Sequence, residues 1–205
     1  MSHGKQFTLY SHYRGANGWK AAIALEELGL TYHTIYFNFD KLEHKNAEYV
    51  KLNPNGRIPT IIDHHNNDFT VGMSSLAVLC MQLTIARKGV GCDPDVPRGE
   101  LQWLFFQASG QGPYFGQVGW FKLFHPEKVP SAILSKNGSL AASAPSQIFP
   151  SSCGNHLATT FLLADYEGFN FEKDFPAVHK WHNTMLARPS VKKCMELRES
   201  LLNAH

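Results

Sequence analysis

Four cysteines carry the most reactive side chains of this chain, but their spacing favours no common cysteine chemistry. Cys80, Cys92, Cys153 and Cys194 lie far apart and form no C-x-x-C pair. A dithiol oxidoreductase needs thiols in one short turn, and the turn-like stretch at residues 12–18 contains none. The sequence therefore favours free thiols in a reducing cytoplasm over a disulfide framework, and it argues against disulfide exchange.

Two histidines have a spacing that could hold a metal ion. His179 and His182 are three residues apart in a segment that predicts a helix, so they share one face. No third ligand lies nearby, so an exposed helix surface is favoured and we expect no metal. The G-x-S-x-G, G-x-G-x-x-G and P-loop motifs are absent from the sequence.

An aromatic cluster at residues 114–124 has two open interpretations. It includes Tyr114, Phe115 and Trp120. These rings form either the core of a helical domain or the wall of an apolar pocket. Between two domains, such a wall could bind hydrophobic electrophiles.

Length and charge exclude several classes of protein. The chain has 205 residues, of which 43% are hydrophobic, enough for a sizeable core. A net charge of +2 argues against a general attraction to nucleic acid or anionic membranes. The sequence has no apolar run of about 18 residues and no secretory signal at its N-terminus. We therefore expect a cytoplasmic protein without nucleic-acid or membrane partners.

The first 89 residues alternate strand and helix signals. β-Branched and aromatic runs predict strands, and apolar residues at helical spacing predict helices. The order β-α-β-α-β-β-α favours a small mixed sheet with helices packed on it. The predicted strands are 7–10, 31–36, 57–63 and 69–71, and the predicted helices are 19–28, 47–52 and 74–86.

The second part of the chain has no strand signal. Residues 90–97 contain two prolines and predict a linker, and residues 98–205 predict a helical domain. Within it, residues 135–152 are small and polar without an apolar period, which predicts irregular or disordered chain. The fold class is therefore α/β followed by all-α, with later helices expected at 98–109, 175–186 and 190–202.

The most specific motif of the chain is Leu-Asn-Pro-Asn-Gly-Arg-Ile-Pro at residues 52–59. With the segments 9–11, 15–20, 25–30, 109–115 and 124–128, it resembles cytosolic glutathione S-transferases. The similarity is greatest to the fungal branch that includes the yeast nitrogen-catabolite regulator. This resemblance implies a thioredoxin-like domain at residues 1–89 that binds glutathione, followed by the helical domain.

The resemblance also implies how the glutathione sulfur is activated. A thiol with a pKa of roughly 8.5 is mostly protonated at neutral pH, so a transferase must favour the thiolate. Backbone N–H groups at a helix N-terminus favour an anion. Similarity to the fungal branch points to Asn17, helped by the Ser11 hydroxyl, as the sulfur-stabilising group. A plain helix N-cap is the alternative role of Asn17, and both roles can coexist.

The rest of glutathione would be bound by residues from several loops. Arg57, Ile58 and Pro59 match the family's cis-proline turn, whose backbone groups would pair with the cysteinyl backbone of glutathione. His44 matches a histidine that contacts the glycyl end in relatives, although as one of 11 histidines it would by itself be read as a surface residue. Ser74 matches the serine that binds the γ-glutamyl carboxylate.

Two positions depart from the family pattern. Met73 stands where relatives carry an acid that holds the γ-glutamyl amine. Losing this charge-assisted contact costs about 1.5–3 kcal/mol, or one to two decades of affinity. Asp68 and Glu100 are candidate replacements. The second departure is at residues 135–152, where relatives have a long helix, and an incompletely covered core there would favour a partner.

Three functions remain compatible with these residues. A glutathione S-transferase-like enzyme would add the thiolate to a hydrophobic electrophile, in detoxification or secondary-metabolite biosynthesis, and relatives imply a homodimer. A catalytically weak or inactive homologue would instead act as a regulatory or interaction protein. Glutathione-dependent reduction or isomerisation would use the same site. The electrophile pocket is expected at Tyr13, Tyr114, Phe115 and Trp120.

Overall fold

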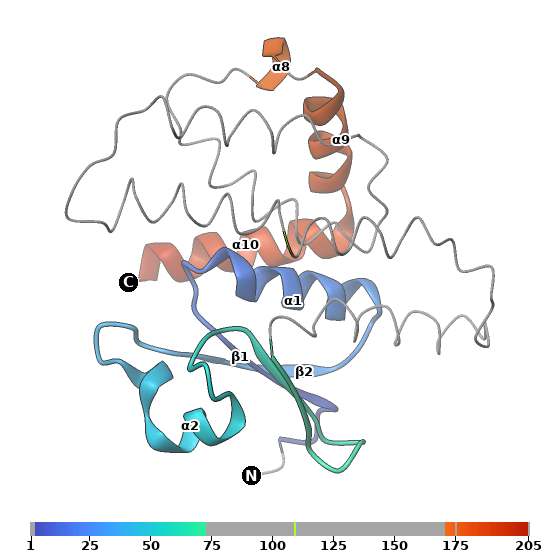
Figure 1. Ribbon diagram of the computed structural model, residues 1–205. Helices are drawn as coiled ribbons and strands as arrows, with labels where there is room; N and C mark the ends of the chain where they lie inside the picture. The colour runs from blue at the N-terminus through green and yellow to red at the C-terminus, as the bar shows by residue number, and fades with distance from the viewer. Residues whose placement is uncertain (1–2, 73–108, 110–170, 175, 205) are drawn as a thin grey trace. The chain divides into compact units, whose positions relative to one another are not determined.

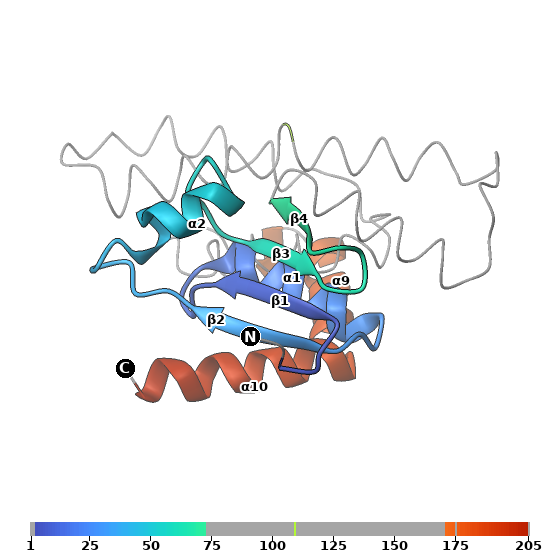
Figure 2. The same cartoon turned by 90° about the horizontal axis from the view of Figure 1, so that it is seen from below.

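Four strands form one mixed sheet in the computed structural model of the chain, which describes residues 3–72, 109, 171–174 and 176–204 (Figure 1). Figure 2 shows the strand order β2-β1-β3-β4. β1 is parallel to β2 and antiparallel to β3, which pairs antiparallel with β4. The four predicted strands are confirmed, although β3 begins after Pro59, which has no N–H for the sheet. The bounds are Phe7–Ser11 for β1, Tyr32–Tyr36 for β2, Thr60–Asp63 for β3 and Phe69–Gly72 for β4.

Helix α1 connects β1 with β2, and a 3-10 turn, η1, and helix α2 connect β2 with β3. The Oδ1 atom of Asn46 caps α2 by accepting the Tyr49 N–H at 2.7 Å. α1 begins three residues earlier than the sequence pattern predicts. Gly18 makes this possible, because it lets the first helical turn lie directly against β1. The bounds are Ala16–Glu27 for α1, Glu43–Lys45 for η1 and Ala47–Leu52 for α2.

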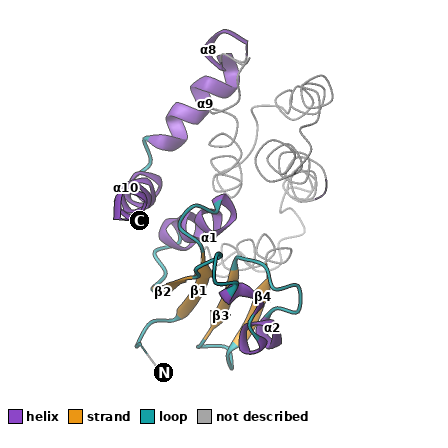
Figure 3. Cartoon of the chain, turned by 90° about the vertical axis from the view of Figure 1, so that its left-hand side faces the viewer, coloured by secondary structure: helices purple, strands orange, loops and turns teal. Residues whose placement is uncertain are grey.

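Side chains from β1 alternate between the two faces of the sheet. Ser11 lies against Gly18 of α1, and α1 covers that face of the sheet (Figure 3). Tyr10 points to the other face, where its ring centroid lies 5.3 Å from that of Tyr49 in α2. The buried apolar core around the sheet includes Phe7, Leu9, Trp19, Ile23, Leu25, Phe37, Tyr49, Ile58 and Ile61.

The C-terminal helix belongs with the sheet. The chain divides into one unit of Met1–Asp93 with Ala187–His205 and a second of Pro94–Leu186. In the first unit, α10 (Pro189–Ala204) lies along α1 (Figure 1). Arg188 pairs with Glu27, and Lys193 Nζ lies 2.8 Å from a Glu26 carboxylate oxygen. This division places α10, whose Val191 and Cys194 are buried, with the sheet and not with the other residues of 98–205.

The second unit contains two described helices, α8 (Phe171–Asp174) and α9 (Pro176–Leu186). α9 and α10 confirm the helices predicted at 175–186 and 190–202. No helix within the described segments is long and apolar enough to span a membrane. Other predictions lie outside the described residues, namely the helices at 74–86 and 98–109, the linker, residues 135–152, and Met73, Ser74, Tyr114, Phe115 and Trp120.

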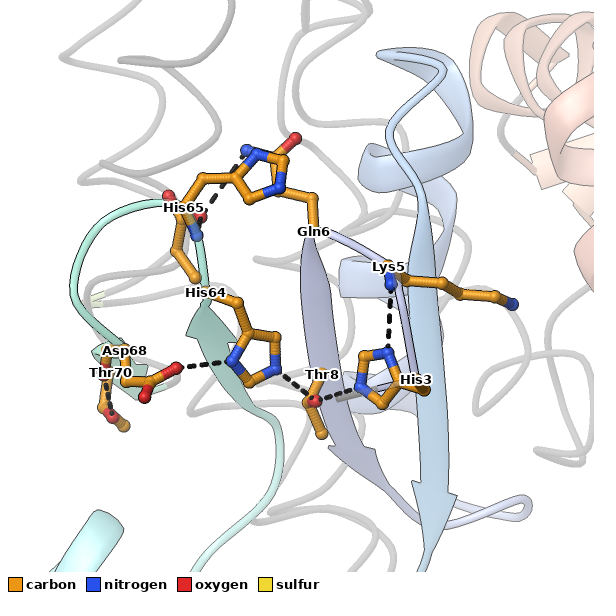
Figure 4. Close-up of polar contacts among 9 residues, drawn as sticks. His3, Lys5, Gln6, Thr8, His64, His65, Asp68 and Thr70 are labelled. Atoms are coloured by element: carbon orange, nitrogen blue, oxygen red, sulfur yellow. Dashed lines mark hydrogen bonds and ion pairs between the residues drawn. The ribbon is translucent and has the colours of Figure 1, made fainter. Parts of the chain in front are cut away.

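A row of polar side chains crosses one end of the sheet (Figure 4). The Lys5 N–H donates to His3 Nδ1 at 3.2 Å, so neutral His3 carries its proton on Nε2 and donates it to Thr8 Oγ1 at 2.7 Å. The Thr8 hydroxyl then donates to His64 Nε2 at 2.8 Å, and His64 Nδ1–H donates to the Asp68 carboxylate. The row is therefore complete when both histidines are neutral.

Acid is expected to lower stability through His3. Partial burial, together with His33, His64 and Lys5, lowers the pKa of His3 below 6.5. The folded chain therefore binds this proton more weakly than the unfolded chain, so the stabilisation is complete above pH 6.5 and is lost as the pH falls through the lowered pKa. Urea unfolding between about pH 5 and 7.5 should show a larger loss for wild type than for His3→Gln. Equal losses would contradict this role of His3.

Candidate functional site

The N-terminus of α1 has no side-chain cap. Gly15 is the N-cap and offers no side-chain acceptor, and the first turn contains no acid. Asn17 is the second residue of the helix, so the alternative that it serves as the N-cap is wrong. Its side chain is half-buried, and its amide forms no hydrogen bond with a described residue. The Gly18 N–H donates to the Gly15 carbonyl, whereas the N–H groups of Ala16 and Asn17 and the Asn17 side-chain amide have no partner among the described residues and could bind an anion.

Lys20 adds positive charge to the same end of α1. It follows Asn17 by three residues, so the two residues are neighbours on one helix face. Burial lowers the pKa of Lys20 to about 8, so the ammonium is still mostly protonated at neutral pH. An anion beside Asn17 would gain from this charge.

Ser11, which we expected to assist Asn17, is buried beneath α1. Its exposed fraction is 2%, and its hydroxyl occupies the place where a Cβ on Gly18 would stand. The hydroxyl therefore faces the first helical turn and is shielded from solvent. We assign Ser11 to the packing of β1 on α1 and not to contact with a substrate.

A buried network fixes the turn that precedes β3. Asn53 Nδ2 donates to the Arg57 carbonyl at 2.8 Å and to Thr60 Oγ1 at 2.9 Å. The Tyr49 hydroxyl lies 2.6 Å from the same carbonyl and 2.8 Å from the same hydroxyl. Asn53 and Tyr49 are both buried, so water does not compete for these hydrogen bonds.

Tyr49→Phe is expected to destabilise the chain by about 1.5 kcal/mol, because one buried hydroxyl with two partners is lost while Asn53 still serves both. Tyr10→Phe is the matched control, since the Tyr10 hydroxyl has no hydrogen bond with a described residue. Denaturant unfolding of the two variants measures the difference. Equal stability of the two would show that the network contributes nothing.

Ile58 lies beside the start of α1. The Ile58–Pro59 peptide bond is cis, as expected from the sequence. A Cβ on Gly15 would lie 3.0 Å from Ile58 Cδ1, so glycine allows the two loops to approach. Neither the N–H nor the C=O of Ile58 has a hydrogen-bond partner among residues 3–72. The Ile58 backbone, without a partner among these residues, thus lies next to the helix that carries Asn17. The Arg57 side chain is exposed.

His44 presents an unpaired nitrogen from η1. Its Nδ1 atom is buried and has no hydrogen-bond partner in the described part of the chain. Burial, and to a smaller extent Lys45, lowers the pKa of His44, so the ring is neutral at pH 7. Gly56 has a φ of +53°, and a Cβ there would lie 2.9 Å from the His44 carbonyl oxygen. This close approach holds the turn before β3 against η1.

Stacked rings connect the loop before α1 with the loop before α2. The ring centroid of His12 lies 4.7 Å from that of Tyr13 and 4.2 Å from that of Phe39, which lies 4.3 Å from His44. Tyr13, expected in the electrophile pocket, also has the Arg14 guanidinium 5.4 Å from its ring centroid. Sequence reasoning missed His12 and Phe39, because no local pattern shows that two loops will meet.

The described residues contain no group of three or more His, Cys, Asp or Glu side chains that could hold a metal ion. The pair at His179 and His182 remains without a third ligand there. His179 Nε2 instead lies 3.2 Å from Asn183 Nδ2.

Comparison with known proteins places this geometry in a family. Residues 5–74 match the glutathione S-transferase N-terminal domain. The chain is 40% identical to glutathione S-transferase 1 of Schizosaccharomyces pombe, over 97% of this chain and 99% of that protein. The chain belongs to the glutathione S-transferase family. Asn17, His44 and Ile58 all lie within the segment that matches the family's N-terminal domain.

Solved structures of glutathione transferases have the same fold. The crystal structure of the glutathione transferase URE2P6 from Phanerochaete chrysosporium, in complex with oxidized glutathione, has 46% sequence identity and a TM-score of 0.84, covering 98% of this chain and 99% of that one. Ure2p in complex with glutathione has 26% identity and a TM-score of 0.81, with 94% of each chain covered. The transcriptional regulator URE2 of Saccharomyces cerevisiae is 30% identical, over 92% of this chain and 67% of that protein. The predicted family, thioredoxin-like domain and helical C-terminal region are confirmed.

Proposed function

We propose that this glutathione S-transferase-like protein joins the sulfur of glutathione to a hydrophobic electrophile. The observation that carries the proposal is the uncapped N-terminus of α1, where the half-buried Asn17 amide has no hydrogen bond with a described residue. Donors held in place around a developing anion stabilise it without reorganisation. A thiolate is the anion that the family uses, and the fungal transferase URE2P6 binds oxidized glutathione.

The neighbouring groups fit the rest of glutathione. The unpaired backbone of Ile58 would receive the cysteinyl backbone as one more extended strand, and the buried Nδ1 of His44 would bond the glycyl end. Ser74 would accept the γ-glutamyl end. Separate segments of the chain would therefore supply one complementary contact each, which suits an extended tripeptide.

In the proposed reaction, the Asn17 amide and the α1 N–H groups hold the sulfur as a thiolate, and the thiol proton leaves to solvent. The sulfur electron pair forms a bond to the electrophilic carbon, and the leaving group departs with its own electron pair. We place the acceptor near Tyr13, Tyr114, Phe115 and Trp120. Retention on immobilised glutathione and turnover of a chlorinated nitroaromatic compound test the proposal. Absence of binding at millimolar glutathione would overturn it.

Met73→Glu is expected to tighten glutathione binding about tenfold, because the new carboxylate would pair with the γ-glutamyl amine. A glutathione titration followed by thermal shift measures the gain, since a ligand that binds only the folded chain raises the melting temperature. Met73→Gln is the control, because it has similar size without the charge. Equal affinities for Met73→Glu and Met73→Gln would show that residue 73 does not face the amine.

A regulatory role is the second candidate. Two observations favour it: Met73 lacks the charge of the usual acid, and the chain is 30% identical to the transcriptional regulator URE2 of Saccharomyces cerevisiae. A protein that acts this way would co-purify with a partner and show no thiol chemistry. Turnover at rates well above the uncatalysed reaction would exclude a purely regulatory role.

We further propose a homodimer that works in the cytoplasm, in detoxification or in the biosynthesis of secondary metabolites. Sedimentation equilibrium would distinguish a mass near twice 23.0 kDa from that of one chain. A screen of electrophiles would distinguish the two roles, because detoxification requires broad acceptance whereas biosynthesis favours one acceptor.

A further inference from the structure

His12 lies at the centre of the stacked rings that join two site loops. Its ring is nearly parallel to both neighbours, at 27° to Tyr13 and 23° to Phe39. Phe39 in turn contacts the ring of His44. His12 therefore connects the loop that ends at Gly15, the N-cap of α1, with the loop that carries His44.

Two hydrogen bonds connect His12 with the backbone of its own loop. The Arg14 N–H donates to His12 Nδ1 at 3.2 Å, and the Gly15 N–H donates to the His12 carbonyl at 3.0 Å. The first of these resembles an Asx-turn, in which a side-chain acceptor bonds the N–H two residues later. Since Nδ1 accepts a hydrogen bond, it carries no proton, and the ring is neutral.

We propose that neutral His12 is a positioning residue that holds the N-terminus of α1 and His44 at the separation that glutathione spans. The inference rests on the proposed function, because that function assigns Asn17 and His44 to the two parts of one ligand. His12 acts through these two residues, and we assign it no contact with the reacting atoms.

Protonation should disrupt this arrangement. A proton on Nδ1 would face the Arg14 N–H and remove the hydrogen bond. The charged and titratable groups around the ring are Arg14 and Tyr13 on its own loop, and Asp40 and His44 on the loop before α2. Burial is the main cause that lowers the pKa of His12, Arg14 and His44 lower it further, and Asp40 opposes them. The KM for glutathione should therefore rise as the pH falls below 6.5.

Two substitutions separate the contacts of His12. His12→Asn keeps an acceptor at the position of Nδ1 and loses the ring, whereas His12→Phe keeps the ring and loses the acceptor. If both contacts position the site, each variant should raise the KM for glutathione about three- to tenfold at pH 7.5, with kcat less affected. In wild type, KM should rise at acid pH through both His12 and His44. In each variant, only the part of this rise that is due to His44 should remain. Circular dichroism melting confirms that the variants are folded.

The outcomes distinguish this inference from the proposed function. Wild type that neither binds nor turns over glutathione removes the proposed function, and the positioning role falls with it. Wild type that is active while both folded variants keep its KM and its pH profile overturns the role of His12 alone. A loss confined to kcat would also overturn it, because a positioning residue for glutathione must change KM.

Discussion

Asn17→Ala should lower kcat/KM for glutathione about 100-fold, the loss typical of removing one donor to a developing anion. The reason is the position of Asn17 in the uncapped first turn of α1, where its amide has no hydrogen bond with a described residue. Without the Asn17 amide as a donor, the thiol of bound glutathione should keep a pKa closer to that of free glutathione. The measurement is the pH dependence of kcat/KM with a chlorinated nitroaromatic acceptor, whose midpoint should shift upward in the variant.

Asn46→Ala is the matched control for Asn17→Ala. It removes an asparagine that caps α2 through the Tyr49 N–H, so it should cost about 1 kcal/mol of stability and leave the midpoint of the pH profile unchanged. Asn17→Asp is the isosteric test, because a carboxylate at this place should repel the thiolate and shift the midpoint at least as far. If Asn17→Ala keeps the wild-type midpoint, another group stabilises the sulfur.

Gly18→Ala should destabilise the fold by about 3 kcal/mol, at the upper end of overpacking costs. The new Cβ would occupy the place of the Ser11 hydroxyl and lie 3.0 Å from the Ser11 Cβ. Ser11 cannot move into solvent, since it is buried between β1 and α1. Elsewhere in a helix the same substitution would stabilise by roughly 0.5–1 kcal/mol, so even the sign of the effect tests the packing. Urea unfolding measures it.

A double-mutant cycle assigns the effect of Gly18→Ala to Ser11. Ser11→Gly together with Gly18→Ala should recover most of the loss, because both atoms that the new Cβ meets first are gone. Gly72→Ala is the control, since its Cβ would meet Asn53 Nδ2 at an ordinary 3.6 Å. A Gly18→Ala variant as stable as wild type would show that the Ser11 hydroxyl is not beneath the helix.

The strands and helices of residues 3–72 follow from local patterns. β-Branched and aromatic runs predicted β1 and β2, and the resemblance of residues 52–59 to the family's cis-proline turn predicted the cis bond at Pro59. The errors are local as well. α1 starts at Ala16 and not at Trp19, because sequence pattern treats Gly18 as a turn residue, whereas packing against Ser11 requires glycine inside the helix.

The site could be predicted only in part for a related reason. Asn17 and His44 were proposed from similarity to a family on residue types alone, and their roles stay predictions. Ser11 was predicted from the same resemblance to assist Asn17, yet its hydroxyl lies beneath α1, against Gly18. Which face of a strand a side chain takes depends on the sheet register, and a motif does not specify it.

The sequence by itself determined the family, the order of the strands and helices, and the candidate groups for binding glutathione, because these depend on residue types close together in the chain. Only the tertiary structure decided that His12 stacks between Tyr13 and Phe39, that Gly15 meets Ile58, and that α10 joins α1. Apart from the stacking of His12 on the adjacent Tyr13, these contacts join residues far apart in the sequence. Their geometry follows from how whole elements pack, which no local pattern encodes.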